Sequence, residues 1–153
     1  SYNAVLEIKE STFAGCTKLK SVDLGRVTSI GKCAFQNCTQ LEKLVIPNSV
    51  ETLFSSFIGC SSLKEVVIGT GVKELKNTYY DYYGVFQDCP KLTNVTFKTN
   101  ILTSLSSNTF KNCRSLKKIE IPASVTSIGE SCFESCSVLS HIYMNATTPP
   151  TIQ

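Results

Sequence analysis

Apolar residues recur along this chain in one frame, Phe-x-x-Cys-x-x-Leu-x-x-apolar-x-apolar, and mostly polar residues fill the positions between them. The frame begins six times, at Phe13, Phe35, Phe57, Phe86, Phe110 and Phe133. Successive starts are 22, 22, 29, 24 and 23 residues apart. A period of this length predicts a solenoid, in which each repeat forms one coil that buries its apolar side only against neighbouring coils.

Each repeat contains two apolar segments that predict opposite edges of a coil. The Leu-x-x-apolar-x-apolar half has the two-residue alternation of a half-buried strand. A second apolar pair, as in residues 27–30 and 125–128, predicts a tighter turn or a second short strand on the opposite side. The stretch from Phe to Cys is too short for a full helix and predicts a single helical or 3₁₀ turn.

The repeat over residues 110–129 reads Phe-x-x-Cys-x-x-Leu-x-x-Ile-x-Ile-Pro-x-Ser-Val-x-x-Ile-Gly, and residues 35–53 nearly repeat it. This pattern closely resembles the BspA-like class of leucine-rich repeats, and the resemblance covers nearly the whole chain. It implies a right-handed leucine-rich-repeat solenoid with a parallel β-sheet on its concave face. Short turns, 3₁₀ segments and short strands are expected on the convex side.

We expect one domain over residues 1–153, with about six repeats of 22–29 residues. Residues 5–13 align with residues 27–35, so the chain opens in the middle of a coil. Solenoids normally end in polar caps, because an open end exposes the stacked core. We therefore expect this chain to be a fragment of a longer array.

The charge pattern argues against two classes of partner. The formal net charge is only +3, and Lys and Glu alternate along the chain instead of clustering. Nucleic-acid binders usually carry a basic stripe with interleaved aromatic residues. The sequence therefore predicts no nucleic-acid partner and, since it has no long apolar stretch, no membrane insertion in this segment.

Six of the eight cysteines occupy the same frame position: Cys16, Cys38, Cys60, Cys89, Cys113 and Cys136. In a solenoid they form a column with coils about 4.8 Å apart and side chains pointing in parallel. A disulfide needs Cβ atoms about 3.8 Å apart that face one another. We therefore predict free thiols that act as small buried hydrophobes, with S–H groups able to reach a turn carbonyl.

The cysteines also suggest two chemical uses. Cys33 with Cys38, and Cys132 with Cys136, have the spacing of half zinc sites, but structural zinc needs four ligands and the chain has one histidine. A Cys136 nucleophile with His141 as its base requires an accessible thiol, whereas the frame predicts burial. No Ser/His/Asp set, phosphate-binding Gly loop or carboxylate pair is present, so we predict no enzyme, no cofactor and no metal.

The residues that flank the middle apolar position of each strand are predicted to point away from the core. This strand-face set is Asp23, Lys43, Glu65, Asn94, Lys118, Glu120, His141 and Tyr143. Across six coils it spans roughly 25 Å, enough for a protein-binding strip. The alternative is a solvated face on which Lys43 pairs with Glu65 across two strands.

The long third interval contains a second candidate site, in residues 77–84. This insertion carries Tyr79, Tyr80, Tyr82 and Tyr83. Tyrosine offers a rigid apolar ring with a polar tip and is favoured in protein and sugar recognition. The alternative is that some of these rings fold back as a lid over neighbouring coils.

The family resemblance implies a cell-surface or secreted microbial protein with roles in adhesion and in binding host or other partner proteins. The expected function is non-enzymatic protein recognition through the strand face. A passive spacer and a glycan-binding module that uses the Tyr-rich loop stay open as alternatives.

Overall fold

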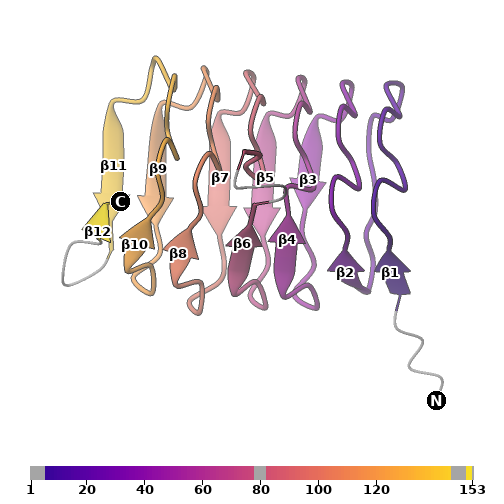
Figure 1. Cartoon of the computed structure of the whole chain (residues 1–153), viewed down its shortest axis with the longest axis horizontal. Coiled ribbons are helices and arrows are strands. Elements are labelled where there is room, and N and C mark those ends of the chain that lie inside the picture. The colour runs from indigo at the N-terminus through magenta and orange to yellow at the C-terminus, as the bar shows by residue number, and fades with distance from the viewer. Residues whose placement is uncertain (1–5, 78–81, 146–150, 153) are drawn as a thin grey trace.

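The computed structural model describes residues 6–77, 82–145 and 151–152. Figure 1 shows a row of similar coils stacked side by side, with strands on two sides and turns at the top and bottom of the view. Every strand pair in the described residues is parallel. The predicted solenoid of parallel strands is therefore confirmed.

One strand per repeat forms the side that we call the strand face. Its strands are β3 (Lys43–Val45), β5 (Glu65–Ile68), β7 (Asn94–Phe97), β9 (Lys118–Ile121) and β11 (His141–Met144). Each begins two residues after the frame leucine, and its middle apolar residue points inward, as the alternation predicts.

Shorter strands lie on the opposite side of the coils. They are β1 (Leu6–Ile8), β2 (Val27–Ile30), β4 (Thr52–Phe54), β6 (Glu74–Lys76), β8 (Ser104–Leu105), β10 (Ser127–Ile128) and β12 (Thr151–Ile152). The second apolar pair of each repeat thus forms a strand and not only a turn.

The frame phenylalanines form a continuous stack along the solenoid. Successive ring centroids are 5.1 to 5.8 Å apart, with interplanar angles of at most 20°. Phe35, Phe57, Phe86 and Phe110 are fully buried. Each coil supplies one ring at the same place, so the stack holds neighbouring coils in register.

The Phe-to-Cys segment is a chain of single hydrogen-bonded turns, and no helix occurs in the described residues. The amide of Cys38 donates to the carbonyl of Phe35, and the amide of Leu41 donates to that of Cys38, the i+3→i spacing of a 3₁₀ turn. The residue before each frame cysteine has a positive φ, and it is most often Gly, Asn or Asp, as in Gly59 and Asn112. These residue types adopt the left-handed conformation most easily, so they permit the tight turn.

The prediction of one continuous strand face over six coils was wrong in two places. Residues 21–24 of the first frame do not form a strand. The remaining strands divide into a sheet of β3, β5 and β7 and a sheet of β9 and β11, with no ladder between β7 and β9. We call this break the β7–β9 seam.

Proline supplies a physical reason for both interruptions. Pro47 directly follows Ile46 after β3, and Pro122 directly follows β9. The equivalent residues after β7 and β11, Lys98 and Asn145, donate their amides to the preceding coil. Proline has no N–H and cannot make that bond, so β3 and β9 each lack one link to the coil before them.

Candidate binding face

The structure brings seven of the eight predicted strand-face residues into two parallel rows. On one side of the seam Lys43, Glu65 and Asn94 are register partners, and on the other Lys118 pairs with His141 and Glu120 with Tyr143. All are exposed except Glu65, which is half-buried. The eighth, Asp23, is exposed but lies outside any strand, where its Oδ1 accepts a hydrogen bond of 2.9 Å from the Gly25 amide. Asp23 therefore closes a local turn.

Ion pairs between coils neutralise part of this face. Lys43 Nζ lies 3.1 Å from a Glu65 carboxylate oxygen, so the cross-strand pairing considered in the sequence is present. Beside it, Lys64 contacts Glu42 at 3.0 Å and holds the pKa of that carboxyl below its usual range, through a hydrogen bond and its charge. Since exposed pairs contribute little to stability, these residues remain available to a partner.

The C-terminal part of the face is aromatic. The His141 and Tyr143 rings, two residues apart on β11, stack with centroids 6.0 Å apart and an interplanar angle of 12°. His141 Nδ1 also lies 2.9 Å from Ser140 Oγ. Tyr143 is 48% exposed, so an aromatic surface lies directly beside Glu120.

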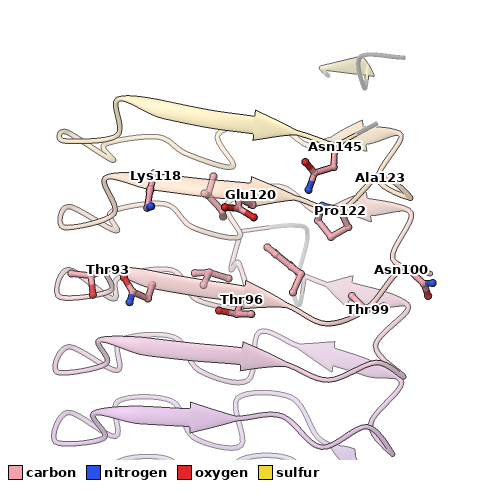
Figure 2. A pocket seen from close by; sticks show the side chains of 13 residues that line it. Thr93, Thr96, Thr99, Asn100, Lys118, Glu120, Pro122, Ala123 and Asn145 are labelled. Atoms are coloured by element: carbon pink, nitrogen blue, oxygen red, sulfur yellow. The ribbon is translucent and has the colours of Figure 1, made fainter. Parts of the chain in front are cut away.

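A pocket of about 480 Å³ opens at the β7–β9 seam. Figure 2 shows its side chains coming from β7, from β9, from the turns that follow them, and from Asn145 after β11. Among them are Asn100 and Asn145, which the sequence analysis did not select. The sequence contains one signal of this difference between repeats. Leu102 lies five residues after Phe97, whereas the equivalent Val125 lies four residues after Ile121.

A second hollow of about 440 Å³ lies beside β3 and β5. Arg26 and Lys98 bring positive charge to it, and Val45 and Val67 bring apolar surface. Val45 is 61% exposed, the most exposed valine of the strand face. This part of the face therefore combines charge with an apolar contact area.

The Tyr-rich loop is described only in part. Tyr79 and Tyr80 lie outside the described residues. Tyr82 is 71% exposed and Tyr83 43% exposed, so these two rings do not form the lid considered in the sequence. The Tyr83 carbonyl accepts a hydrogen bond from Ser55 Oγ, which ties the end of the insertion to the preceding coil.

The frame cysteines form the predicted column of free thiols. From Cys38 onward, each Sγ donates to the frame phenylalanine carbonyl of the preceding coil at 3.1 to 3.4 Å. Burial raises the pKa of Cys60 to about 12. Cys16 is an exception to the predicted burial, because no described coil covers the outer side of its turn, and it is exposed.

The chemical alternatives find no assembled site in the part of the chain that is described. No three His, Cys, Asp or Glu side chains lie close enough together there to hold a metal. Cys136 is half-buried, and its thiol donates to the Phe110 carbonyl. Burial raises its pKa, which opposes formation of a nucleophilic thiolate. The described residues also include no helix with the length and apolar character needed to cross a bilayer.

The profile of the BspA type leucine rich repeat region matches six copies in this chain, over residues 2–83 and 82–151. The chain belongs to this family. BspA-type leucine-rich repeats are repeat modules, and repeats of this kind commonly mediate protein interactions and generally lack catalytic activity. None of the curated proteins matches the chain significantly.

Two solved structures are similar to this BspA-type chain. A leucine-rich repeat protein from Eubacterium ventriosum shares 33% identity over 86% of the chain, with a TM-score of 0.67. A leucine-rich repeat protein from Bacteroides ovatus shares 26% identity over 90% of the chain, with a TM-score of 0.57. The chain spans only 34% of the first protein and 40% of the second.

Proposed function

We propose that this BspA-type repeat domain is a non-enzymatic recognition module that binds a protein partner through its strand face, at the cell surface or in secreted form. The observation that carries the proposal is the pair of exposed side-chain rows on parallel strands. Their residues differ from coil to coil, while the buried frame beneath them stays constant. A rigid backbone that presents a variable surface suits recognition, because little ordering is needed on binding.

The chemistry of the face supports a protein ligand. Exposed Val45 and the Tyr143 ring supply apolar contact area, and Lys43, Lys118 and Glu120 supply charges of both signs around it. Protein interfaces commonly combine aromatic anchors with a polar rim. The surface location is supported by membership of a family associated with microbial surface and adhesion proteins.

The proposal is tested by binding of the purified domain to a panel of purified extracellular-matrix proteins. The test variant is Lys43→Glu with Lys118→Glu, which reverses two exposed charges on the strand face. Lys73→Glu is the matched control, because Lys73 also pairs across coils, with Glu51 at 2.7 Å, but lies on the opposite side next to β6.

We expect the double variant to lose binding and the Lys73→Glu control to retain it, with both proteins folded by circular dichroism. Equal binding by wild type and double variant would argue against the strand face. Binding by none of the panel would favour a passive spacer.

The exposure of Tyr82 and Tyr83 favours a second candidate, recognition of glycans or proteins through the inserted loop. Deletion of residues 78–83 tests it on the same panel, extended with glycans. Loss of binding in this variant alone would assign recognition to the loop.

A further inference from the structure

The β7–β9 seam interrupts the hydrogen bonding of the strand face between two repeats that are otherwise stacked. At the start of the strand segment, Lys64 donates its amide to Glu42, Thr93 to Lys64 and Ser140 to Lys117, at 2.8 to 3.0 Å. Lys117 has the equivalent position in its coil, and over residues 82–145 its amide has no such bond to the Thr93 carbonyl. The facing backbone groups of β7 and β9 therefore form no ladder along the seam.

The repeat between the two sheets changes partners from one side to the other. Its β7 is bonded to β5 in the preceding coil, whereas its β8 is bonded to β10 in the following coil. The extra residue between Phe97 and Leu102 lies where this change occurs. Thr99, in the same turn, donates its hydroxyl to the Val72 carbonyl of the preceding coil at 2.6 Å. This bond ties the turn to the preceding coil.

Solvent consequently reaches residues of β7 whose equivalents in β5 are buried. Val95 and Phe97, the inward residues of β7, are half-buried, whereas Val66 and Ile68 of β5 are fully buried. Phe97 packs its edge against Phe110, with centroids 6.5 Å apart. The seam pocket therefore has an apolar floor formed by inward-facing residues of β7.

The rim of the pocket is polar and electrically balanced. Asn94, Thr96, Asn100 and Asn145 offer amides and a hydroxyl, which both donate and accept hydrogen bonds. Lys118 and Glu120, one positive and one negative, are the charged side chains of the rim (Figure 2). Such a site favours neither a free anion nor a free cation.

The width of the seam restricts the ligand further. Cα atoms of β7 and β9 still come within 8 Å of one another, whereas an inserted peptide strand needs its two neighbours about 9.5 Å apart. An added strand therefore does not fit, but a ligand hydroxyl is small enough to approach backbone groups that no ladder engages, such as the Lys117 amide. A pyranose ring has both required features, an apolar C–H face for Val95 and Phe97 and a hydroxyl edge for the rim.

We propose that the seam pocket binds a neutral saccharide unit, the end of a glycan chain. Its volume of about 480 Å³ lies in the range of small-ligand pockets and holds one or two sugar rings. The next sugar of the chain extends toward Tyr143, whose exposed ring lies beside Glu120 on the neighbouring strand. This site is separate from the Tyr-rich loop and from Lys43, but it shares Lys118 and Glu120 with the face proposed to bind protein.

The test is a titration of the ¹⁵N-labelled domain with the methyl glycosides of glucose, galactose, mannose and N-acetylglucosamine, followed by NMR. We expect saturable shifts for at least one glycoside, confined to residues 93–100, 117–123 and 145. The variant Asn94→Ala with Asn145→Ala should weaken binding by about tenfold or more. Gln40→Ala, which removes an exposed amide outside the pocket, should leave it unchanged.

Three results would overturn the inference: no saturable shift with any of the four glycosides, shifts centred on Tyr82 and Tyr83, or stronger binding of a sulfated glycoside than of its neutral parent. The single variant Lys43→Glu changes a residue outside the pocket and should not alter saccharide binding. Its effect on protein binding therefore tests the strand face independently of this site, which the double variant with Lys118→Glu does not.

Discussion

Truncation of Phe110 tests whether the ring stack holds the coils together. Phe110 is fully buried, its ring lies between those of Phe86 and Phe133 at 5.7 and 5.6 Å, and Phe97 meets it edge-on. Loss of a buried phenylalanine costs about 3–5 kcal/mol. Three ring contacts are lost at once, so we expect Phe110→Ala to reduce the free energy of unfolding by about 4–5 kcal/mol.

Phe133→Ala is the matched comparison at the edge of the stack. This ring is half-buried and stacks on Phe110 alone among the described rings, so we expect a loss of about 2 kcal/mol. Phe110→Leu, which retains part of the buried volume, should cost about 1–2 kcal/mol and stays measurable if the alanine variant does not fold.

The assay is urea denaturation followed by circular dichroism, with wild type and all three variants under the same conditions. The expected order of stability is wild type, Phe110→Leu, Phe133→Ala, Phe110→Ala, with the two middle variants close together. Equal losses for Phe110→Ala and Phe133→Ala would refute the reasoning, because the magnitude would then not follow burial and ring contacts.

Three further predictions concern the thiols and the seam. Burial raises the pKa of Cys60 and Cys132 to about 12. As the pH rises above 9, these thiols lose their protons in the unfolded chain before they do so in the folded one, so the free energy of unfolding should fall from pH 9 toward 12. A free energy of unfolding that stays constant over this range would contradict the prediction. With an aromatic disulfide reagent at pH 8, exposed Cys16 should react rapidly and the fully buried thiols only after denaturation. With a pKa of about 12, only about one in 10,000 Cys60 thiols is ionised at this pH. Mass spectrometry of the labelled peptides checks this, and early labelling of Cys60 would count against it. The third prediction concerns amide hydrogen exchange measured by NMR. The Lys117 amide at the seam should exchange faster than the Thr93 amide, which donates to the preceding coil. Equal protection of the two amides would mean that β7 and β9 are hydrogen-bonded in solution.

The repeating frame was sufficient to predict the architecture. Apolar residues such as Leu63, Phe57 and Val72 recur once per repeat, and only stacked coils bury residues at that spacing on one side of the chain. The strand of each coil on the strand face and its exposed rows follow from the two-residue alternation, whereas the second apolar pair was compatible with either a turn or a short strand. The free thiol column follows from the geometry of parallel side chains.

The seam could not be predicted from that frame, because Val95 and Phe97 satisfy it as well as Val66 and Ile68 do. Their partial exposure depends on whether β9 bonds to β7, which is a property of two coils together. Pro122 and the extra residue before Leu102 are visible in the sequence, but each is compatible with an intact ladder when taken alone.

The sequence by itself determined the repeat, its buried residues and the side on which its variable residues lie, because those depend on spacing within one coil. Only the tertiary structure decided that the strand face is divided, that Asn100 and Asn145 join Asn94 at one pocket, and that Tyr82 and Tyr83 stay exposed. These features arise from the register between coils, where a single missing donor or one added residue shifts the backbone without changing the pattern.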